Sequence, residues 1–191
     1  MAVAAVVVLS GCAAAGGDSD VRVDPSTSQV IVESQADPWE LPLEERPELF
    51  DPCAEIPVEA VEEGVGSPVR PDDELRINRP GELFACGWKN EEVLFGVLST
   101  WKSRGDYLRD ESFVASESEV LGRPGLRLLS KADMGDNSCR QLFFSSEGTL
   151  FVSVDLIHGL ASFKGQVFAN SCSVLDEAIV PVVQHLPDGD F

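Results

Sequence analysis

Alternation of apolar and polar residues predicts a β-sheet in the second half of the chain. The clearest pattern occupies residues 139–145 and 149–157, which are joined by a short turn at 146–148. The positions of the second run that alternate toward one side are Leu150, Val152, Val154 and Leu156. Period-two alternation around a short turn is typical of a β-hairpin, so we expect a hairpin here.

Further strands are predicted upstream of this hairpin. Residues 84–89 and 93–101 form a second pair around an Asn90-Glu91 turn, and residues 113–120 alternate with Ser and Glu as an edge strand does. In 93–101 one face carries Val93, Phe95, Val97 and Trp101, and the other carries Leu94, Leu98 and Thr100. Both faces of the sheet are therefore expected to be partly covered.

Three segments show helical signals. Pro57 is suited to start a short helix that ends at Gly64 or Gly66, and residues 103–110 form another short helix. Residues 174–186 carry an apolar stripe at helical spacing, in which Pro181 should kink or restart the helix near Val180. Strands followed by terminal helices predict an α+β fold, with an antiparallel β-sheet and helices packed on one face.

The remaining segments of this region are expected to be loops and one more strand. Residues 67–80 are polar with three prolines and predict a loop, and residues 122–125 (Gly-Arg-Pro-Gly) predict a turn before a strand at 125–131. The missing N–H of Pro124 argues against a phosphate-binding loop at this turn.

The first twelve residues look like a bacterial lipoprotein leader. Residues 2–9 form an apolar run that is followed by Leu9-Ser10-Gly11-Cys12, which resembles a lipobox. The resemblance implies cleavage after Gly11, lipidation of Cys12 and a signal peptide at 1–11. No Lys or Arg precedes the short apolar run, so we expect the true translation start to lie upstream. The alternative is a buried apolar strand with a core cysteine.

Residues 12–48 have the composition of an acidic, proline-rich tether, most of which we expect to be disordered or extended. The basic residues of this segment are Arg22 and Arg46, far fewer than its acids, and few apolar residues could offset the entropy of ordering. The folded domain is expected at 49–191. Apolar residues near the junction either dock on the domain, which we favour for the last few of them, or stay solvated, or form a partner-binding peptide. These residues are Trp39, Leu41, Leu43, Leu49 and Phe50.

Four cysteines remain for the folded domain: Cys53, Cys86, Cys139 and Cys172. An even number in an exported chain predicts disulfides. We prefer Cys53 with Cys86 and Cys139 with Cys172, because the two loops then have equal length and each ties one end of the chain to a neighbouring element. Zinc fits poorly, since no Cys-x-x-Cys is present and no His lies near a Cys in the sequence. Free buried thiols are the remaining alternative.

The amino-acid composition narrows the range of possible binding partners. The 191 residues include 14 Lys plus Arg and 33 Asp plus Glu, a formal net charge of −19. Nucleic acid is therefore excluded as a partner, because phosphates would have to be neutralised by basic residues. No apolar run approaches the roughly 20 residues that span a bilayer.

Catalytic and metal-binding patterns are weak, and no cofactor or metal is expected. His158 and His185 are the only histidines, and no Gly-x-Ser-x-Gly motif accompanies them. Asp133, Asp136 and Asn137 carry oxygen ligands suited to calcium but do not fit an EF-hand, and the same residue types favour a turn. We therefore expect a protein that is not an enzyme.

A longer pattern resembles a known family. Residues 49–53 (Leu-Phe-Asp-Pro-Cys), Cys86-Gly87-Trp88, a glycine-rich segment near 122–125, a strand with Cys139 and a last helix opened by Cys172 are similar to actinobacterial secreted lipoproteins of unknown function. The resemblance covers residues 49–187. It implies an envelope lipoprotein with two disulfides and a palmitate-type anchor on the outer face of the cell membrane.

Two roles remain open for such a domain. Trp88 and Trp101 are candidates to line a ligand pocket, although packing in the core is the preferred interpretation. We expect a binding or interaction module for envelope proteins, and the alternative is a carrier of a lipid or other small amphiphile. A carrier needs a closed cavity lined by the strand faces, whereas an interaction module needs a filled core and an exposed apolar patch.

Overall fold

The computed structural model describes residues 38, 40–157, 160 and 162–189. The predicted leader, Cys12, most of the tether, Trp39 and His158 lie outside the described residues. Helices occupy Leu43–Glu45 (η1), Pro52–Glu55 (α1), Val58–Val65 (α2), Asp73–Leu75 (η2), Arg104–Arg109 (α3), Ser171–Ala178 (α4) and Val180–Val183 (α5). Strands occupy Arg70–Pro71 (β1), Ile77–Arg79 (β2), Leu83–Lys89 (β3), Val93–Thr100 (β4), Phe113–Val120 (β5), Arg123–Ser130 (β6), Ser138–Ser145 (β7) and Gly148–Leu156 (β8).

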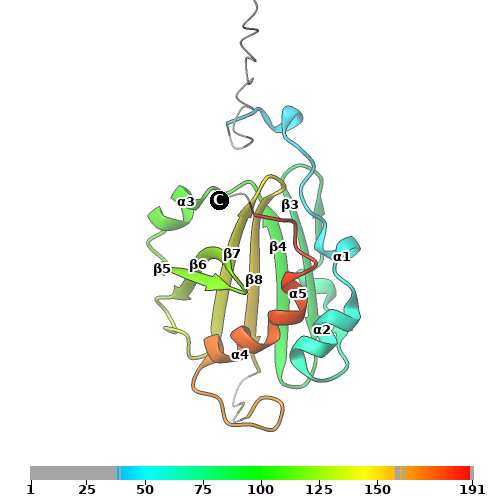
Figure 1. Ribbon diagram of the computed structural model, residues 1–191, viewed down its shortest axis with the longest axis vertical. Coiled ribbons are helices and arrows are strands. Elements are labelled where there is room, and N and C mark those ends of the chain that lie inside the picture. Colours follow the sequence, from blue (N-terminus) through cyan, green and yellow to red (C-terminus); the bar gives the residue numbers. More distant parts are fainter. Residues whose placement is uncertain (1–37, 39, 158–159, 161, 190–191) are drawn as a thin grey trace, which may run out of the picture. The chain divides into compact units, whose positions relative to one another are not determined.

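The eight strands form one antiparallel sheet (Figure 1). Its order is β1-β3-β4-β8-β7-β6-β5, and β2 also pairs with β3. The predicted hairpin is confirmed as β7 and β8, which run in register from Ser138 opposite Asp155 to Ser145 opposite Gly148. The second predicted hairpin is confirmed as β3 and β4, whose turn is held by Asn90 because its side chain accepts hydrogen bonds from the amides of Glu92 and Val93 at 2.8 Å.

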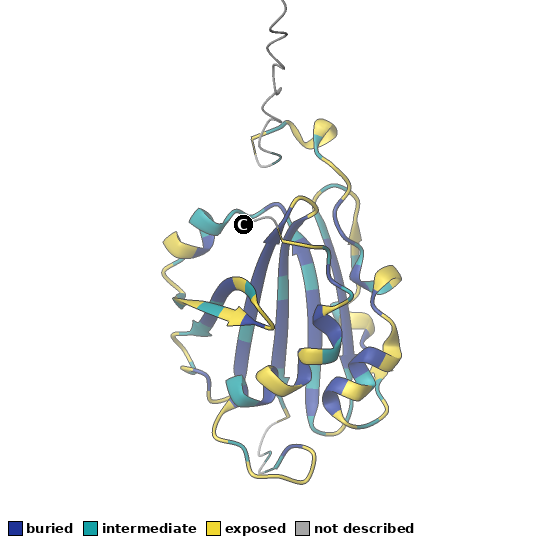
Figure 2. Cartoon of the chain, in the orientation of Figure 1, coloured by how far each residue is buried: buried dark blue, intermediate teal, exposed yellow. Residues whose placement is uncertain are grey.

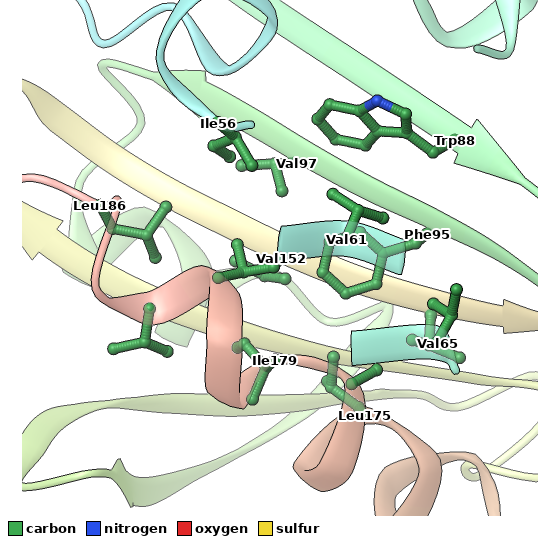
Figure 3. Packing of buried hydrophobic residues seen from close by; sticks show 14 of the residues in the cluster. Ile56, Val61, Val65, Trp88, Phe95, Val97, Val152, Leu175, Ile179 and Leu186 are labelled. Carbon is green, nitrogen blue, oxygen red and sulfur yellow. The ribbon is translucent and has the colours of Figure 1, made fainter. Parts of the chain in front are cut away.

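Helices α1, α2, α4 and α5 cover one face of the sheet, which we call the helix-covered face (Figure 1). Its strand residues alternate with those of the other side, as predicted for Val93, Phe95 and Val97 of β4. Leu175 and Ile179 of the helical layer pack in the same buried cluster (Figure 3). Figure 2 shows that these helices carry both buried and exposed residues, and that most residues of the central strands are buried. The predicted α+β class, with helices on one face, is confirmed.

The helix ends follow local sequence signals. Gly66 ends α2 with a φ of +76°, a left-handed conformation that glycine adopts without strain. Helix α3 begins with a capping box, in which the side chain of Ser103 accepts a hydrogen bond from the backbone amide of Asp106, and the side chain of Asp106 accepts one from the amide of Ser103. Pro181 lies within α5, and the chain restarts its helix after Ile179 as predicted.

Both predicted disulfides are present. Cys53 of α1 is bonded to Cys86 of β3, and Cys139 of β7 is bonded to Cys172 of α4. Each bond links a helix to the sheet across the helix-covered face. Disulfides of this kind are typical of proteins exported to an oxidising compartment, so the domain belongs outside the cytoplasm. None of the helices that the structure describes is long and apolar enough to cross a bilayer.

The predicted docking of the junction is confirmed for its last residues. Leu49 and Phe50 are only 2% and 5% exposed, and the carbonyl of Phe50 accepts a hydrogen bond from the Ser99 hydroxyl. The amide of Phe50 also donates to the carbonyl of Glu147 at 3.2 Å. The folded part of the chain therefore begins by residue 49.

Two local predictions were wrong. The segment 67–80 is not only a loop, because β1 and β2 pair with β3 and η2 lies between them. Residues 123–125 belong to β6, and the turn before them is made by Leu121 and Gly122, both with positive φ. Pro124 is tolerated there because the pairing of β6 with β7 begins only at Leu126, so β6 has one neighbour at this point.

A groove on the second face of the sheet as candidate ligand site

The second face of the sheet, which we call the open face, carries a groove over the central strands. Its floor is formed by Leu94, Gly96 and Leu98 of β4 with Phe151 and Ser153 of β8, and its volume is about 250 Å³. These positions are brought side by side by the register, which sets Leu94 opposite Asp155, Gly96 opposite Ser153 and Leu98 opposite Phe151. Leu94, Leu98 and Phe151 are half-buried, so the groove exposes apolar surface.

Small residues make the groove deep at its centre. Gly87 of β3 lies opposite Gly96, and Gly96 lies opposite Ser153. No large side chain therefore projects from the open face along this row of residues. The side chain of Leu75 from η2 fills part of the space, because a Cβ placed on Gly87 would lie 2.6 Å from the Cβ of Leu75. Leu75 and Ile77 thereby form one wall of the groove.

Hydrogen bonds and an ion pair of Asp72 hold this wall of the groove in place. Its side chain accepts a hydrogen bond from the Glu74 amide at 3.0 Å and caps η2, and its carboxylate pairs with Lys89 at 2.5 Å. Its own amide donates to the carbonyl of Gly87 at 2.8 Å. The hydrogen bond from Lys89 is the main reason that the pKa of Asp72 lies below its usual value.

Arg140 of β7 forms the far side of the groove. Its guanidinium lies over the rings of Phe113 and Phe151, with the central carbon 5.5 and 5.9 Å from the ring centroids. It also donates to the hydroxyl of Ser138 at 3.0 Å, and its side chain is only 19% exposed. Contacts with two aromatic rings and a hydrogen bond limit the movement of the guanidinium.

Asp155 is the carboxylate of the groove, and its pairing is loose. The closest Arg140 nitrogen is 4.0 Å from its oxygen, whereas the other ion pairs among the described residues measure 2.5 to 2.8 Å. Burial raises the pKa of Asp155, Arg140 opposes this effect, and the negative charge of Asp133 adds to it. The groove therefore holds a partly desolvated carboxylate whose charge is incompletely compensated.

At the other end of the open face, α3 closes the surface. Tyr107 packs with Leu126, Leu142 and Phe144 in a separate cluster, 6.4 Å from the ring of Phe151. Burial is the main reason that the pKa of Tyr107 lies above its usual value. The groove itself is bounded by Leu75 of η2 and Ile77 of β2 on one side and by Arg140 of β7 on the other.

The two tryptophans predicted as pocket candidates lie elsewhere and apart from each other. Trp88 is 5% exposed in the core of the helix-covered face, 6.4 Å from Phe95, beside a cavity of about 190 Å³ that also contacts the Cys53–Cys86 disulfide. Trp101 packs in a different cluster with Leu49 and Phe84. Their positions agree with the preferred packing interpretation, while a role for Trp88 in that small cavity stays a prediction.

Two further clefts lie at the edges of the domain. One of about 700 Å³ collects Glu48, Asp51, Glu55 and Glu147 around the half-buried His185. The other, of about 750 Å³, contains Arg70, Lys89 and Lys164 together with Glu91 and Glu92. Within the part of the chain that the structure describes, no three His, Cys, Asp or Glu side chains are arranged to hold a metal. Asp133 instead organises its own turn, accepting hydrogen bonds from the Gly135 amide and the Ser138 hydroxyl.

Sequence reasoning identified part of the groove. The alternation in β4 placed Leu94 and Leu98 together on the second face, but Gly96, Arg140 and Asp155 were not singled out. The available signal was Gly87 and Gly96 inside two paired apolar strands, because glycine within a strand often marks the close approach of another group. Arg140 and Asp155 gave no such signal, since charged residues on an outer strand face are common.

Residues 7–185 match the model of a family described as Protein of unknown function (DUF3558). The chain belongs to this family. The DUF3558 match covers every helix and strand named above, both disulfides and the whole groove. No curated protein and no solved structure matches the chain. The predicted resemblance to a family of unknown function is therefore confirmed at that level.

Proposed function

We propose that this DUF3558 protein is a lipoprotein of the cell envelope, held on the outer face of the membrane by a lipid on Cys12. Its domain at 49–191 acts as a non-enzymatic binding module, and the groove on the open face is its binding surface. The observation that carries this proposal is the contrast between the two faces. Helices fill the helix-covered face with side chains, whereas Leu94, Leu98 and Phe151 stay half-exposed on the other.

Three observations support the lipid anchor. The lipobox-like Leu9-Ser10-Gly11-Cys12 follows an apolar run, the family match begins at residue 7 and so includes Cys12, and the domain carries two disulfides. The test is metabolic labelling with an alkyne fatty acid in the native host. We expect label on the wild-type protein and none on Cys12→Ser. An unlabelled wild-type protein, or equal membrane retention of both forms, overturns the anchor.

Site-specific photocrosslinking tests the binding role. A benzophenone amino acid at Leu94 places the reactive group at the groove in living cells. Val180, which is 43% exposed on α5, provides the matched control position on the other side of the domain. We expect an adduct from Leu94 that Val180 does not give. Equal adducts from both positions, or none from Leu94, would show that the groove is not a binding surface.

The mass of the adduct separates the two candidate roles. A protein-sized adduct supports the interaction module. A lipid-sized adduct supports the alternative, a carrier of a small amphiphile, which the apolar floor of the groove also favours.

A further inference from the structure

The size of the groove favours a protein segment over a whole lipid. An apolar cavity of about 150 Å³ holds one benzene molecule, and sites for drug-sized ligands span roughly 300 to 1,000 Å³. At about 250 Å³ the groove fits one aromatic or two aliphatic side chains. Walls on both sides, formed by Leu75 and by Arg140, keep the floor open only between them.

The charges around the groove favour a cationic group. Arg140 is the positive charge on its far side, while Asp155 is the carboxylate that lines the groove. Asp133 lies nearby, because its carboxylate accepts a hydrogen bond from Ser138, the residue opposite Asp155. These three residues sum to one excess negative charge. Lys89 does not compensate it, because Lys89 is paired with Asp72 at 2.5 Å on the opposite wall.

The exposure and loose pairing of Asp155 also favour the binding of a cationic group. Its side chain is 43% exposed, it faces the groove beside Leu94, and Arg140 approaches only to 4.0 Å. Arg140 lies over two rings and donates a hydrogen bond to Ser138, and these contacts oppose its movement toward Asp155. A second cation arriving from outside would complete the pairing. The net charge of −19 would also steer basic partners toward the domain.

We propose that the groove binds a segment of a partner protein in which a bulky apolar side chain stands next to a Lys or Arg. The apolar side chain packs on Leu94, Leu98 and Phe151, and the basic group pairs with the carboxylate of Asp155. This inference rests on the proposed function, since it names the partner class for the same groove.

Three short peptides test the proposal against the mature lipidated protein in phosphatidylcholine nanodiscs. Each carries a fluorophore, and their central sequences are Lys-Phe-Lys, Glu-Phe-Glu and Lys-Ser-Lys. Fluorescence anisotropy against protein-loaded and empty discs gives the affinities. We expect the basic aromatic peptide to bind at least about tenfold more tightly than the other two, because it alone supplies both groups.

Variants locate the binding. Asp155→Asn should weaken binding of the basic aromatic peptide about tenfold, the ratio expected for one charge-assisted contact. Leu94→Ser should weaken it as well, because it removes apolar contact area. Glu59→Gln on the exposed surface of α2 removes the same charge far from the groove and should leave affinity unchanged.

Thermal unfolding separates this role from a purely structural one. A structural ion pair with Arg140 predicts that Asp155→Asn lowers the melting temperature. We expect an unchanged or higher value, because burial disfavours the charge of Asp155 in the free protein. A lower melting temperature together with lost binding would overturn the role assigned to Asp155.

The outcomes distinguish the inference from the function on which it rests. The basic partner is overturned if the acidic peptide binds as tightly as the basic aromatic one, or if Asp155→Asn binds the basic aromatic peptide as tightly as the wild type does. In either case a specific adduct at Leu94 would still support the binding module. A lipid-sized adduct at Leu94 without peptide binding also overturns the partner class and leaves the carrier. Absence of any specific adduct at Leu94 overturns both.

Discussion

Replacing both cysteines of one disulfide by alanine removes a cross-link without leaving an unpaired thiol. Both bonds join residues 33 positions apart, so the loop-entropy model assigns each the same contribution, about 3.7 kcal/mol at 25 °C. The native state distinguishes them. Each bond has one buried and one half-buried cysteine, but Cys139 is fully buried in the core, whereas Cys86 is 9% exposed and already borders a cavity. Loss of the buried sulfur should add about 1 kcal/mol for the void it leaves.

We therefore expect Cys139→Ala/Cys172→Ala to lose about 4 to 5 kcal/mol and Cys53→Ala/Cys86→Ala about 4 kcal/mol. These are large fractions of the roughly 5 to 15 kcal/mol that stabilise a typical domain. Urea titrations followed by circular dichroism give both free energies, with Cys12→Ser as the common background. A loss below about 1 kcal/mol for either pair would refute the assumption that loop closure in the unfolded chain dominates.

Two further substitutions test local features. Gly64→Ala should destabilise the protein by about 1 to 3 kcal/mol despite the better helix propensity of alanine, because the new Cβ would meet the backbone of Ala178. Gly105→Ala in α3 is the matched control. Its new Cβ would meet only a flexible side chain, so this substitution should be neutral or stabilising by up to about 1 kcal/mol. Asp110→Asn should flatten the dependence of stability on pH. The hydrogen bond from Lys102 holds the pKa of Asp110 below its ordinary 3.8, so its contribution is full above that value and is lost as pH falls below it. Urea midpoints at pH 7 and pH 3 measure this, and equal acid losses in the variant and the wild type would contradict it.

The elements that could be predicted are those whose signals are local. The alternation in β7 and β8, the Asn90 turn, the glycine after α2 and the restart of the last helix at Pro181 each depend on a few neighbouring residues. The disulfide pairing preferred for its two loops of equal length is the one that the structure contains.

The elements that were missed depend on distant partners. Strands β1 and β2 are only two and three residues long, too short for an alternating pattern, and they exist because β3 offers an edge for pairing. The composition of residues 122–125 (Gly-Arg-Pro-Gly) predicts a turn, yet Pro124 lies in β6, which has only one neighbouring strand at that point.

By itself the sequence determined the α+β class, the export of the domain implied by its cysteines, and the faces on which the residues of β4 lie. Strand periodicity and covalent chemistry are properties of neighbouring residues, so they can be read along the chain. Only the tertiary structure decided that Gly87, Gly96 and Ser153, all with small or no side chains, lie side by side in the sheet and that Leu75 packs beside them. It also decided that Arg140 and Asp155 are 4.0 Å apart. A groove is made by the register of strands and by what the chain places over them, and these depend on packing across the whole domain.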